Sequence, residues 1–228
     1  MGKGRLARHV REEKATYGAV GGGIVIMEGE LLDAAEQQME SLRAKAVSVS
    51  QALAAAGVPH AVIGGMAVLG HMRRVDRTAY HTTRDLDVLV NRSDLDRAAE
   101  ALKPLGFRFR KVMGIPAFIP PRDAGVKSRF REGVHLIWAG EKVRPDDLAA
   151  APSLEEAPTV LAPDGYACLD VGLLLRMKLT SFRLKDQVHV QDLLEWRLIS
   201  KKIEADLPPE LRERLEQVKR ATERERLG

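Results

Sequence analysis

Residues 83–90 read TRDLDVLV, and shortly before them residues 61–65 read AVIGG. Apolar side chains at Leu86, Val88 and Val90 alternate with other residues, which predicts a strand with a polar beginning. Residues two apart in a strand project from the same face, so Asp85 and Asp87 should present adjacent carboxylates. The earlier segment predicts a second strand that ends in a glycine pair and leads into a helix.

These two segments together predict a site for a metal ion and a phosphate. Two carboxylates held this close repel each other unless a cation or a proton lies between them. Mg²⁺ is the obvious cation, because it prefers oxygen ligands and often binds one or two carboxylates together with substrate phosphates. Gly64 and Gly65, at the start of a helix, let backbone N–H groups approach a phosphate. Each part alone has a simpler explanation: a glycine pair is usually a turn, and an Asp-x-Asp strand usually carries solvated or paired charges.

The order of the two segments resembles the nucleotidyltransferase superfamily with the polymerase-β-like fold, whose hallmark is Gly-Gly or Gly-Ser followed by Asp-x-Asp or Asp-x-Glu. The resemblance covers residues 58–200 approximately and is greatest for the minimal bacterial branch, which includes toxin-type nucleotidyltransferases. It rests on these motifs: Gly64-Gly65-Met66-Ala67, Thr83-Arg84-Asp85-Leu86-Asp87, Lys178-Leu179, Arg183-Leu184-Lys185-Asp186 and Asp192-Leu193-Leu194.

The resemblance implies transfer of a nucleoside monophosphate from a nucleoside triphosphate to an acceptor hydroxyl, with pyrophosphate leaving. It implies two Mg²⁺ ions held by Asp85 and Asp87. The residues that it implies for nucleotide binding are Gly64, Gly65, Thr83, Arg84 and Lys178. Lys178 lies beside an apolar stripe, so two roles are equally expected for it: contact with the phosphates, or a structural role at the edge of the core. Arg183 and Lys185 are expected to pair with Asp186 or solvent rather than with substrate.

This sequence departs from the family pattern at the position of the third carboxylate. Family enzymes carry a further carboxylate on a later strand, and residues 134–141, VHLIWAGE, are the best match. His135 stands where the carboxylate is expected, and a histidine at this point serves either as a general base or as a packed strand residue. If the register of this strand differs from the match, Glu132 or Glu141 takes the position of the third carboxylate. The alternative function is therefore a catalytically degenerate binding protein or a toxin–antitoxin-type regulatory component.

The expected fold class is α+β, with a mixed sheet flanked by helices and a C-terminal helical subdomain. We expect a basic N-terminal extension over 1–27, the α+β domain over 28–145, a linker over 146–162 and the helical subdomain over 163–228. Helices are predicted over Leu31–Ala56 and over 168–184, 186–200 and 209–225 approximately. The last helix either docks along an apolar stripe or forms a dimer contact.

Composition narrows the class of protein. The 228 residues carry a net charge of +4, of which residues 1–14 hold +3, so the remaining chain is nearly neutral and unlike a dedicated duplex binder. No apolar run is long enough to cross a bilayer, and Cys168 has no partner for a disulfide. We expect a cytoplasmic protein whose partners are a nucleoside triphosphate and an acceptor, either RNA, a protein or a small molecule, and no membrane.

Overall fold

A mixed seven-stranded sheet forms the centre of the protein, in the order β3-β4-β5-β2-β1-β7-β6. The computed structural model describes residues 28–120, 132–155 and 157–227, so the predicted N-terminal extension lies outside it. The described strands are β1 (His60–Ile63), β2 (Leu86–Val90), β3 (Arg108–Val112), β4 (Ile115–Ile119), β5 (Val134–Trp138), β6 (Thr159–Leu161) and β7 (Ala167–Leu169). The expected α+β class is confirmed.

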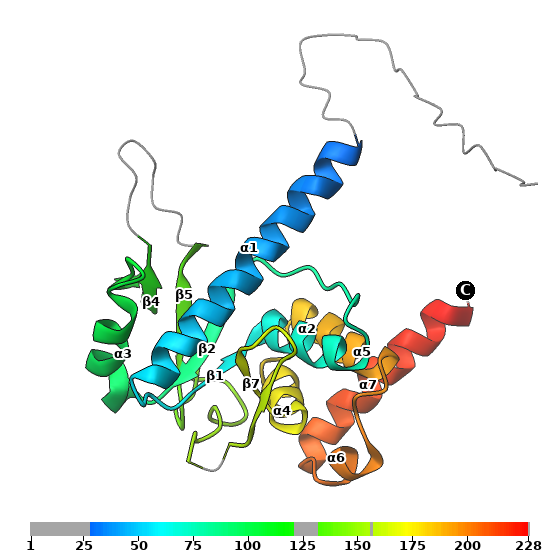
Figure 1. Ribbon diagram of the computed structural model, residues 1–228. Coiled ribbons are helices and arrows are strands. Elements are labelled where there is room, and N and C mark those ends of the chain that lie inside the picture. Colours follow the sequence, from blue (N-terminus) through cyan, green and yellow to red (C-terminus); the bar gives the residue numbers. More distant parts are fainter. Residues whose placement is uncertain (1–27, 121–131, 156, 228) are drawn as a thin grey trace, which may run out of the picture.

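Helices flank this sheet, and four of them follow it in the chain. Figure 1 shows α1 lying across the sheet and α4 to α7 grouped on the side of the molecule away from α3. No described helix is long and apolar enough to cross a membrane. The described helices are α1 (Glu28–Ala55), α2 (Gly64–Val75), the 3₁₀ turn η1 (Arg92–Asp94), α3 (Leu95–Leu102), α4 (Val171–Ser181), α5 (Leu184–Glu195), α6 (Lys201–Ala205) and α7 (Pro209–Leu227).

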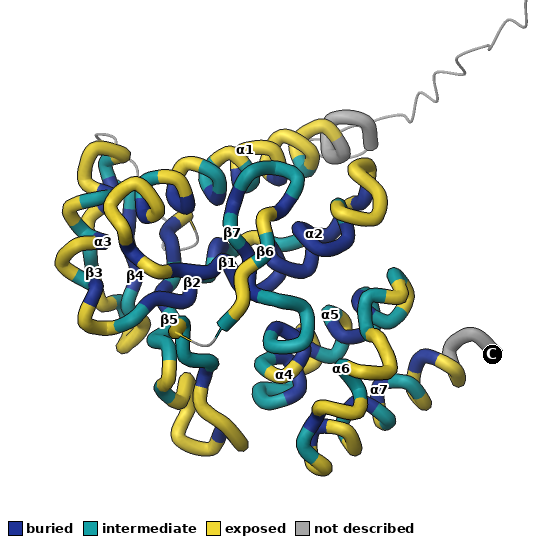
Figure 2. Tube along the Cα trace, turned by 60° about the horizontal axis from the view of Figure 1, so that its bottom comes forward, coloured by how far each residue is buried: buried dark blue, intermediate teal, exposed yellow. Residues whose placement is uncertain are grey.

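The predicted first helix is confirmed, and it covers one face of the sheet. Its residues Met39, Leu42, Ala46, Val49 and Leu53 recur every three or four positions and are all buried. They pack against β1 and α3. Figure 2 shows the same division, with buried residues along β1, β2 and α2 and exposed ones on the outer side of α1.

One row of directly paired residues runs across the other face of the sheet. Arg110 on β3 pairs with Ala117 on β4, which pairs with His135 on β5. His135 pairs with Asp87 on β2, and Asp87 pairs with Ile63 on β1. Directly opposed residues project from the same face of a sheet, so all five side chains share one face.

The structure corrects the prediction of a helix over 168–184. Residues 167–169 form β7, which pairs in parallel with β1 and antiparallel with β6, so β6 lies within the range predicted as a linker. Helix α4 begins only after Asp170, whose side chain accepts a hydrogen bond from Gly172 N at 2.8 Å. The apolar run through β7 continues directly into α4, and periodicity does not separate a short buried strand from a helix.

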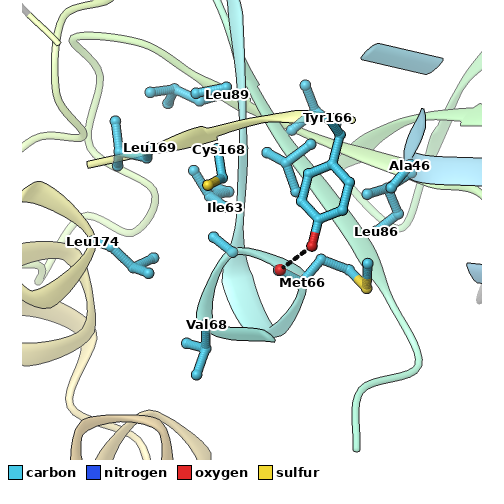
Figure 3. Close-up of a cluster of buried hydrophobic side chains, with 14 of the residues drawn as sticks. Ala46, Ile63, Met66, Val68, Leu86, Leu89, Tyr166, Cys168, Leu169 and Leu174 are labelled. Atoms are coloured by element: carbon cyan, nitrogen blue, oxygen red, sulfur yellow. Dashed lines mark hydrogen bonds between the residues drawn. The ribbon is translucent and has the colours of Figure 1, made fainter. Parts of the chain in front are cut away.

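The residue directly before β7 fixes the start of α2. Tyr166, directly before β7, is fully buried and its hydroxyl donates to the carbonyl oxygen of Met66 at 2.8 Å. Figure 3 shows this ring among Met66, Leu86 and Ala46. The contact holds the first turn of α2, where the glycine pair lies, against the sheet.

The last helix docks on the body, which is the first of the two predicted alternatives. Leu211, Leu215 and Val218 on α7 are buried. From the same helix, Nη1 of Arg214 donates to the carbonyl oxygens of Leu179 and Thr180, each at 2.7 Å. These bonds satisfy carbonyl groups that the end of α4 leaves without helical partners. Helix α7 therefore holds α4 in place beside the sheet.

Candidate functional site

A cavity of about 920 Å³ opens between the Asp87–His135 face of the sheet and helices α4 and α5. Its size lies within the range of small-molecule sites. Five of the residues predicted to be catalytic or to bind the metal or nucleotide line it: Gly64, Asp85, Asp87, His135 and Lys178. They come from four separate parts of the chain, which the fold brings to one place.

Gly64 joins β1 to α2 in a conformation that favours glycine. Its φ is +71°, and a Cβ atom built on it would overlap the carboxylate of Asp87. The next residue is equally confined, since a Cβ on Gly65 would lie 2.6 Å from Oγ1 of Thr83. The helix begins at Gly64 itself, so the glycine pair forms its first two residues. The glycine pair therefore lets the start of α2 approach the Asp-x-Asp segment directly.

The two aspartates lie beside each other at the cavity wall. Asp87 is the second residue of β2 and Asp85 immediately precedes the strand. Both are partly exposed to the cavity. Within residues 28–120, 132–155 and 157–227, no group of three or more His, Cys, Asp or Glu side chains is arranged to hold a metal ion. The protein thus offers a pair of carboxylates for a cation, which suits Mg²⁺ that arrives with phosphate oxygens as further ligands.

His135 occupies the position beside this pair. The parallel register aligns it with Asp87, and Nδ1 of His135 lies 3.4 Å from Oδ1 of Asp87. The alternative acids do not replace it, because neither Glu132 nor Glu141 lines the cavity. Glu141 instead forms a two-point ion pair with Arg92, whose Nε lies 2.7 Å from Oε1. A histidine therefore stands next to the carboxylate pair, as the sequence placed it.

Lys178 reaches the same cavity from α4 through a buried ion pair. Its Nζ lies 3.2 Å from Oδ1 of Asp186 on α5, and the Asp186 side chain is 1% exposed. Asp186 also accepts hydrogen bonds from Nε of Arg183 at 2.7 Å and from Oγ of Ser181 at 2.5 Å. The expected pairing of Arg183 with Asp186 is confirmed. Lys178 is thus a buried cation whose position is fixed by a carboxylate behind it.

Burial and charge act in opposite directions on this network. Burial raises the pKa of Asp186, but hydrogen bonds from Arg183 and Ser181 and the charge of Lys178 outweigh it and lower the pKa to about 2. Burial lowers the pKa of Lys178, and the carboxylates of Asp186 and Asp87 oppose that shift. Asp87 acts on Lys178 electrostatically, which links the two walls of the cavity.

Comparisons with known proteins bear on the fold. No family model and no curated protein matches the sequence. Among solved structures, a crystal structure of an antigenic nucleotidyltransferase-like protein from Paracoccidioides brasiliensis is 19% identical and covers 78% of this chain and 87% of its own, with a TM-score of 0.50. The solution structure of the antibiotic-resistance factor ANT(2'')-Ia is 16% identical and covers 82% of this chain and 97% of its own, with a TM-score of 0.48.

The chain has a nucleotidyltransferase-like fold. The expected superfamily resemblance therefore holds at the level of the fold.

Not every residue expected at the nucleotide lies on the wall of the cavity of this nucleotidyltransferase-like fold. Gly65, Thr83 and Arg84 are absent from it, and Arg84 is exposed. Thr83 packs against the backbone of Gly65. Their nucleotide-binding role stays a prediction, and the contact of Thr83 with Gly65 is one that supports the glycine pair from behind.

The structure adds cavity residues that the sequence did not indicate. Arg144 and Asp147 lie in the loop after β5, and Arg176 lies on α4. Asp147 accepts a hydrogen bond from the backbone N–H of Arg144 at 2.9 Å, which shapes the loop. Arg144 and Arg176 are exposed and have no carboxylate partner within the described part of the chain. No local motif marks these residues, because only the fold brings the loop over the sheet.

A second polar cluster lies behind the glycine pair. Nδ1 of His81 lies 3.1 Å from Oδ2 of Asp192 on α5, and the ring of His81 meets that of His189 edge-on at 4.9 Å. Burial, together with the positive charge of Lys178, lowers the pKa of His189 to about 3, so this ring is neutral at neutral pH. Helix α5 therefore contacts the segment that leads to Asp85 and also supplies Asp186, the carboxylate that holds Lys178.

Proposed function

We propose that the protein transfers a nucleoside monophosphate from a nucleoside triphosphate to an acceptor hydroxyl, with Mg²⁺ as cofactor. The observation that carries this proposal is the meeting of Asp85, Asp87, Gly64 and Lys178 at one cavity of a nucleotidyltransferase-like fold. Asp85 and Asp87, which would bind a cation, thus line the same cavity as the buried ammonium group of Lys178, which would bind phosphate. A reaction that consumes a nucleoside triphosphate also fits the cytoplasmic location expected from the sequence.

Asp85 and Asp87 are the residues that would hold the metal. When bound there, Mg²⁺ would neutralise charge on the triphosphate and make the α-phosphorus more open to attack. The carboxylate pair fits one ion that shares its coordination with phosphate oxygens. Two ions stay a prediction, which a count of Mn²⁺ bound per chain, with and without a non-hydrolysable triphosphate, would test.

The remaining residues act on the substrates. The acceptor oxygen forms a bond to the α-phosphorus, and the bond to the β-phosphate breaks as pyrophosphate leaves. Lys178 would balance negative charge on the phosphates, because Asp186 keeps its ammonium group at the wall. Gly64 would let the chain approach the phosphates closely. His135 would accept the proton of the acceptor hydroxyl, since it lies beside Asp87 at the same wall.

The decisive experiment supplies each α-labelled nucleoside triphosphate with Mg²⁺ and three acceptor pools: total RNA, protein extract and small-molecule extract. The proposal expects label in one pool and stoichiometric release of pyrophosphate. Asp87→Asn should abolish both, whereas Asp146→Asn, at an exposed position outside the cavity wall, should leave both unchanged. Hydrolysis without transfer, or activity that persists in Asp87→Asn, would overturn the proposal.

A second candidate is a catalytically degenerate binding protein, including a regulatory component of a toxin–antitoxin pair. The observation in its favour is His135 in place of a third carboxylate, together with the lack of a three-donor metal group among the described residues. This candidate expects triphosphate binding without pyrophosphate release. It also expects that His135→Asp creates activity that the parent protein lacks.

A further inference from the structure

The turn that joins α4 to α5 is held from outside the cavity by one arginine of α7. Helix α7 packs against both α4 and α5 (Figure 1). From it, Nη1 of Arg214 donates to the carbonyl oxygens of Leu179 and Thr180, each at 2.7 Å. The guanidinium carbon of Arg214 also lies 4.9 Å from the centroid of the Phe182 ring. One side chain of α7 therefore contacts both the last turn of α4 and the residue that follows it.

Phe182, the residue at this turn, has an unfavourable backbone conformation. Its φ is +46°, in the left-handed region, which is strained for a residue that has a Cβ atom. Such a conformation persists only where surrounding contacts hold it. Locally, the backbone N–H of Phe182 donates to the carbonyl oxygen of Lys178 at 2.9 Å, and Nε2 of Gln187 donates to the carbonyl oxygen of Phe182 at 3.2 Å. Arg214 adds a contact from a different helix, over the ring.

The same turn carries the donors that hold the carboxylate behind Lys178. Ser181 and Arg183 both donate hydrogen bonds to Oδ2 of Asp186, at 2.5 and 2.7 Å. Oδ1 of Asp186 lies 3.2 Å from Nζ of Lys178. Because Ser181 and Arg183 directly precede and follow Phe182, a change in the backbone there moves both donors. The position of the Lys178 ammonium group therefore depends on the conformation of Phe182.

Arg214 acts on this network through the turn and not by direct contact. It donates no hydrogen bond to Asp186, and its side chain does not line the cavity. Within the residues that the structure describes, Arg214 also has no carboxylate partner. Its guanidinium group is therefore directed at the end of α4 and the Phe182 ring, and no acidic side chain competes for it.

We infer that Arg214 is a positioning residue for the triphosphate site: it holds the left-handed turn at Phe182 and thereby fixes Lys178 at the cavity wall. The inference rests on the proposed function for the ligand, but not for the coupling between the turn and the ion pair. Without Arg214, the carbonyl oxygens at the end of α4 lose their donor, and the turn relaxes to a less strained conformation. Lys178 then keeps its charge but loses its fixed direction.

The test is a double-mutant cycle on the Kd of a non-hydrolysable triphosphate with Mg²⁺, measured by calorimetry at a temperature where every variant is folded. Arg214→Met should raise the Kd about tenfold in the parent background, a usual coupling within one network. In the Lys178→Met background, it should change the Kd by less than about twofold, because the group that it positions is already absent. A loss of similar size in both backgrounds, or no loss in the parent, would overturn the inference.

Arg212→Met is the matched control. Arg212 lies on the same helix, and its Nη2 donates to the carbonyl oxygens of Ala205 and Leu207, at 2.9 and 3.0 Å. The substitution therefore removes the same kind of contact from a turn that does not lead to Lys178. Urea unfolding should show a similar loss of stability, while the Kd of the triphosphate stays within about twofold of the parent. Equal weakening of triphosphate binding by Arg212→Met and Arg214→Met would mean that general stability, and not the turn, sets the affinity.

Failure here is distinguishable from failure of the proposed function. A parent protein that binds no triphosphate would contradict the proposed function alone. The coupling is also measured without ligand, by an NMR titration of the Asp186 carboxyl group. Arg214→Met should raise the pKa of Asp186 from about 2 toward its usual 3.8, because the donors beside Phe182 move away. Arg212→Met should leave this pKa unchanged. If Arg214→Met also leaves it unchanged, the inference is wrong, whether or not the triphosphate binds.

Discussion

Asp85 and Asp87 are the residues on which nucleotidyl transfer would depend most directly. We predict that Asp85→Asn and Asp87→Asn each reduce transfer by at least about 100-fold, because neither carboxylate alone replaces the pair at the metal. Removing one of two adjacent like charges relieves repulsion in the metal-free protein. Thermal melts in EDTA should therefore show equal or slightly higher stability. Melting well below the parent would mean that these aspartates are structural.

A substitution at Gly64 tests whether the backbone must approach the carboxylate of Asp87 closely. We predict that Gly64→Ala destabilises the protein by about 1–3 kcal/mol and also weakens triphosphate binding, because the new methyl group displaces the Asp87 carboxylate. Gly57→Ala is the matched control: its φ of +65° is similar, but no atom lies within 4 Å of the added carbon. Urea unfolding of both variants separates backbone strain from the overlap. Equal losses would show that contact with Asp87 contributes nothing.

His135 distinguishes a working proton acceptor from a packed residue. If it takes the acceptor proton, His135→Asn should reduce the turnover number about 100-fold or more while triphosphate binding stays nearly unchanged. His135→Asp should restore part of the rate, because a carboxylate at the same position can also accept the proton. Steady-state kinetics beside calorimetric binding gives both quantities. Unchanged turnover in His135→Asn would assign the ring to packing alone.

At the scale of elements, α4 and α5 are joined by the ion pair of Lys178 with Asp186. The pKa of Asp186 is about 2, below the usual value of 3.8, so its charge stabilises the folded state above about pH 4 and that contribution disappears as the pH falls toward 2. The shift corresponds to about 2 kcal/mol. Asp186→Asn should cost about 3 kcal/mol at pH 7, because the charge of Lys178 stays buried without its partner.

Urea unfolding between pH 2 and 7 measures this contribution. The parent should lose more stability than Asp186→Asn as the pH falls from about 4 to 2. Asp146→Asn, at an exposed site, should follow the parent throughout. Parallel curves for the parent and Asp186→Asn would show that the pair does not stabilise the fold.

The elements also show what the sequence could predict. The strand–glycine–helix and Asp-x-Asp segments could be predicted, because local alternation and a glycine pair specify them. Helix α1 could be predicted from its regular apolar spacing. Strand β7 was read as helix, because the apolar run through Ala167–Leu169 continues into α4 and only pairing with β1 makes it a strand. Arg144 and Arg176 were missed as cavity residues, because the position of the loop after β5 and the packing of α4 place them there and no local motif does.

At the scale of the whole molecule, the cavity is shared between two parts of the chain. Asp85, Asp87 and His135 come from the sheet, whereas Lys178 and Arg176 come from α4. A triphosphate that contacts both walls binds only when the sheet and the C-terminal helices are both folded. Ligand binding to the folded state alone stabilises it in proportion to the logarithm of ligand concentration over Kd.

We therefore predict that a non-hydrolysable triphosphate with Mg²⁺, at about 100 times its Kd, stabilises the protein by about 2.7 kcal/mol. For a chain of this size, that corresponds to a rise in Tm of roughly 5–10 °C. The triphosphate in EDTA should produce a much smaller rise, because the charges of Asp85 and Asp87 then oppose the phosphates. Asp87→Asn should lose the metal-dependent part, and Lys178→Met should lose part of the rise at every metal concentration. An equal rise with Mg²⁺ and with EDTA would mean that the triphosphate binds away from the aspartates, and the two-walled site would then be wrong.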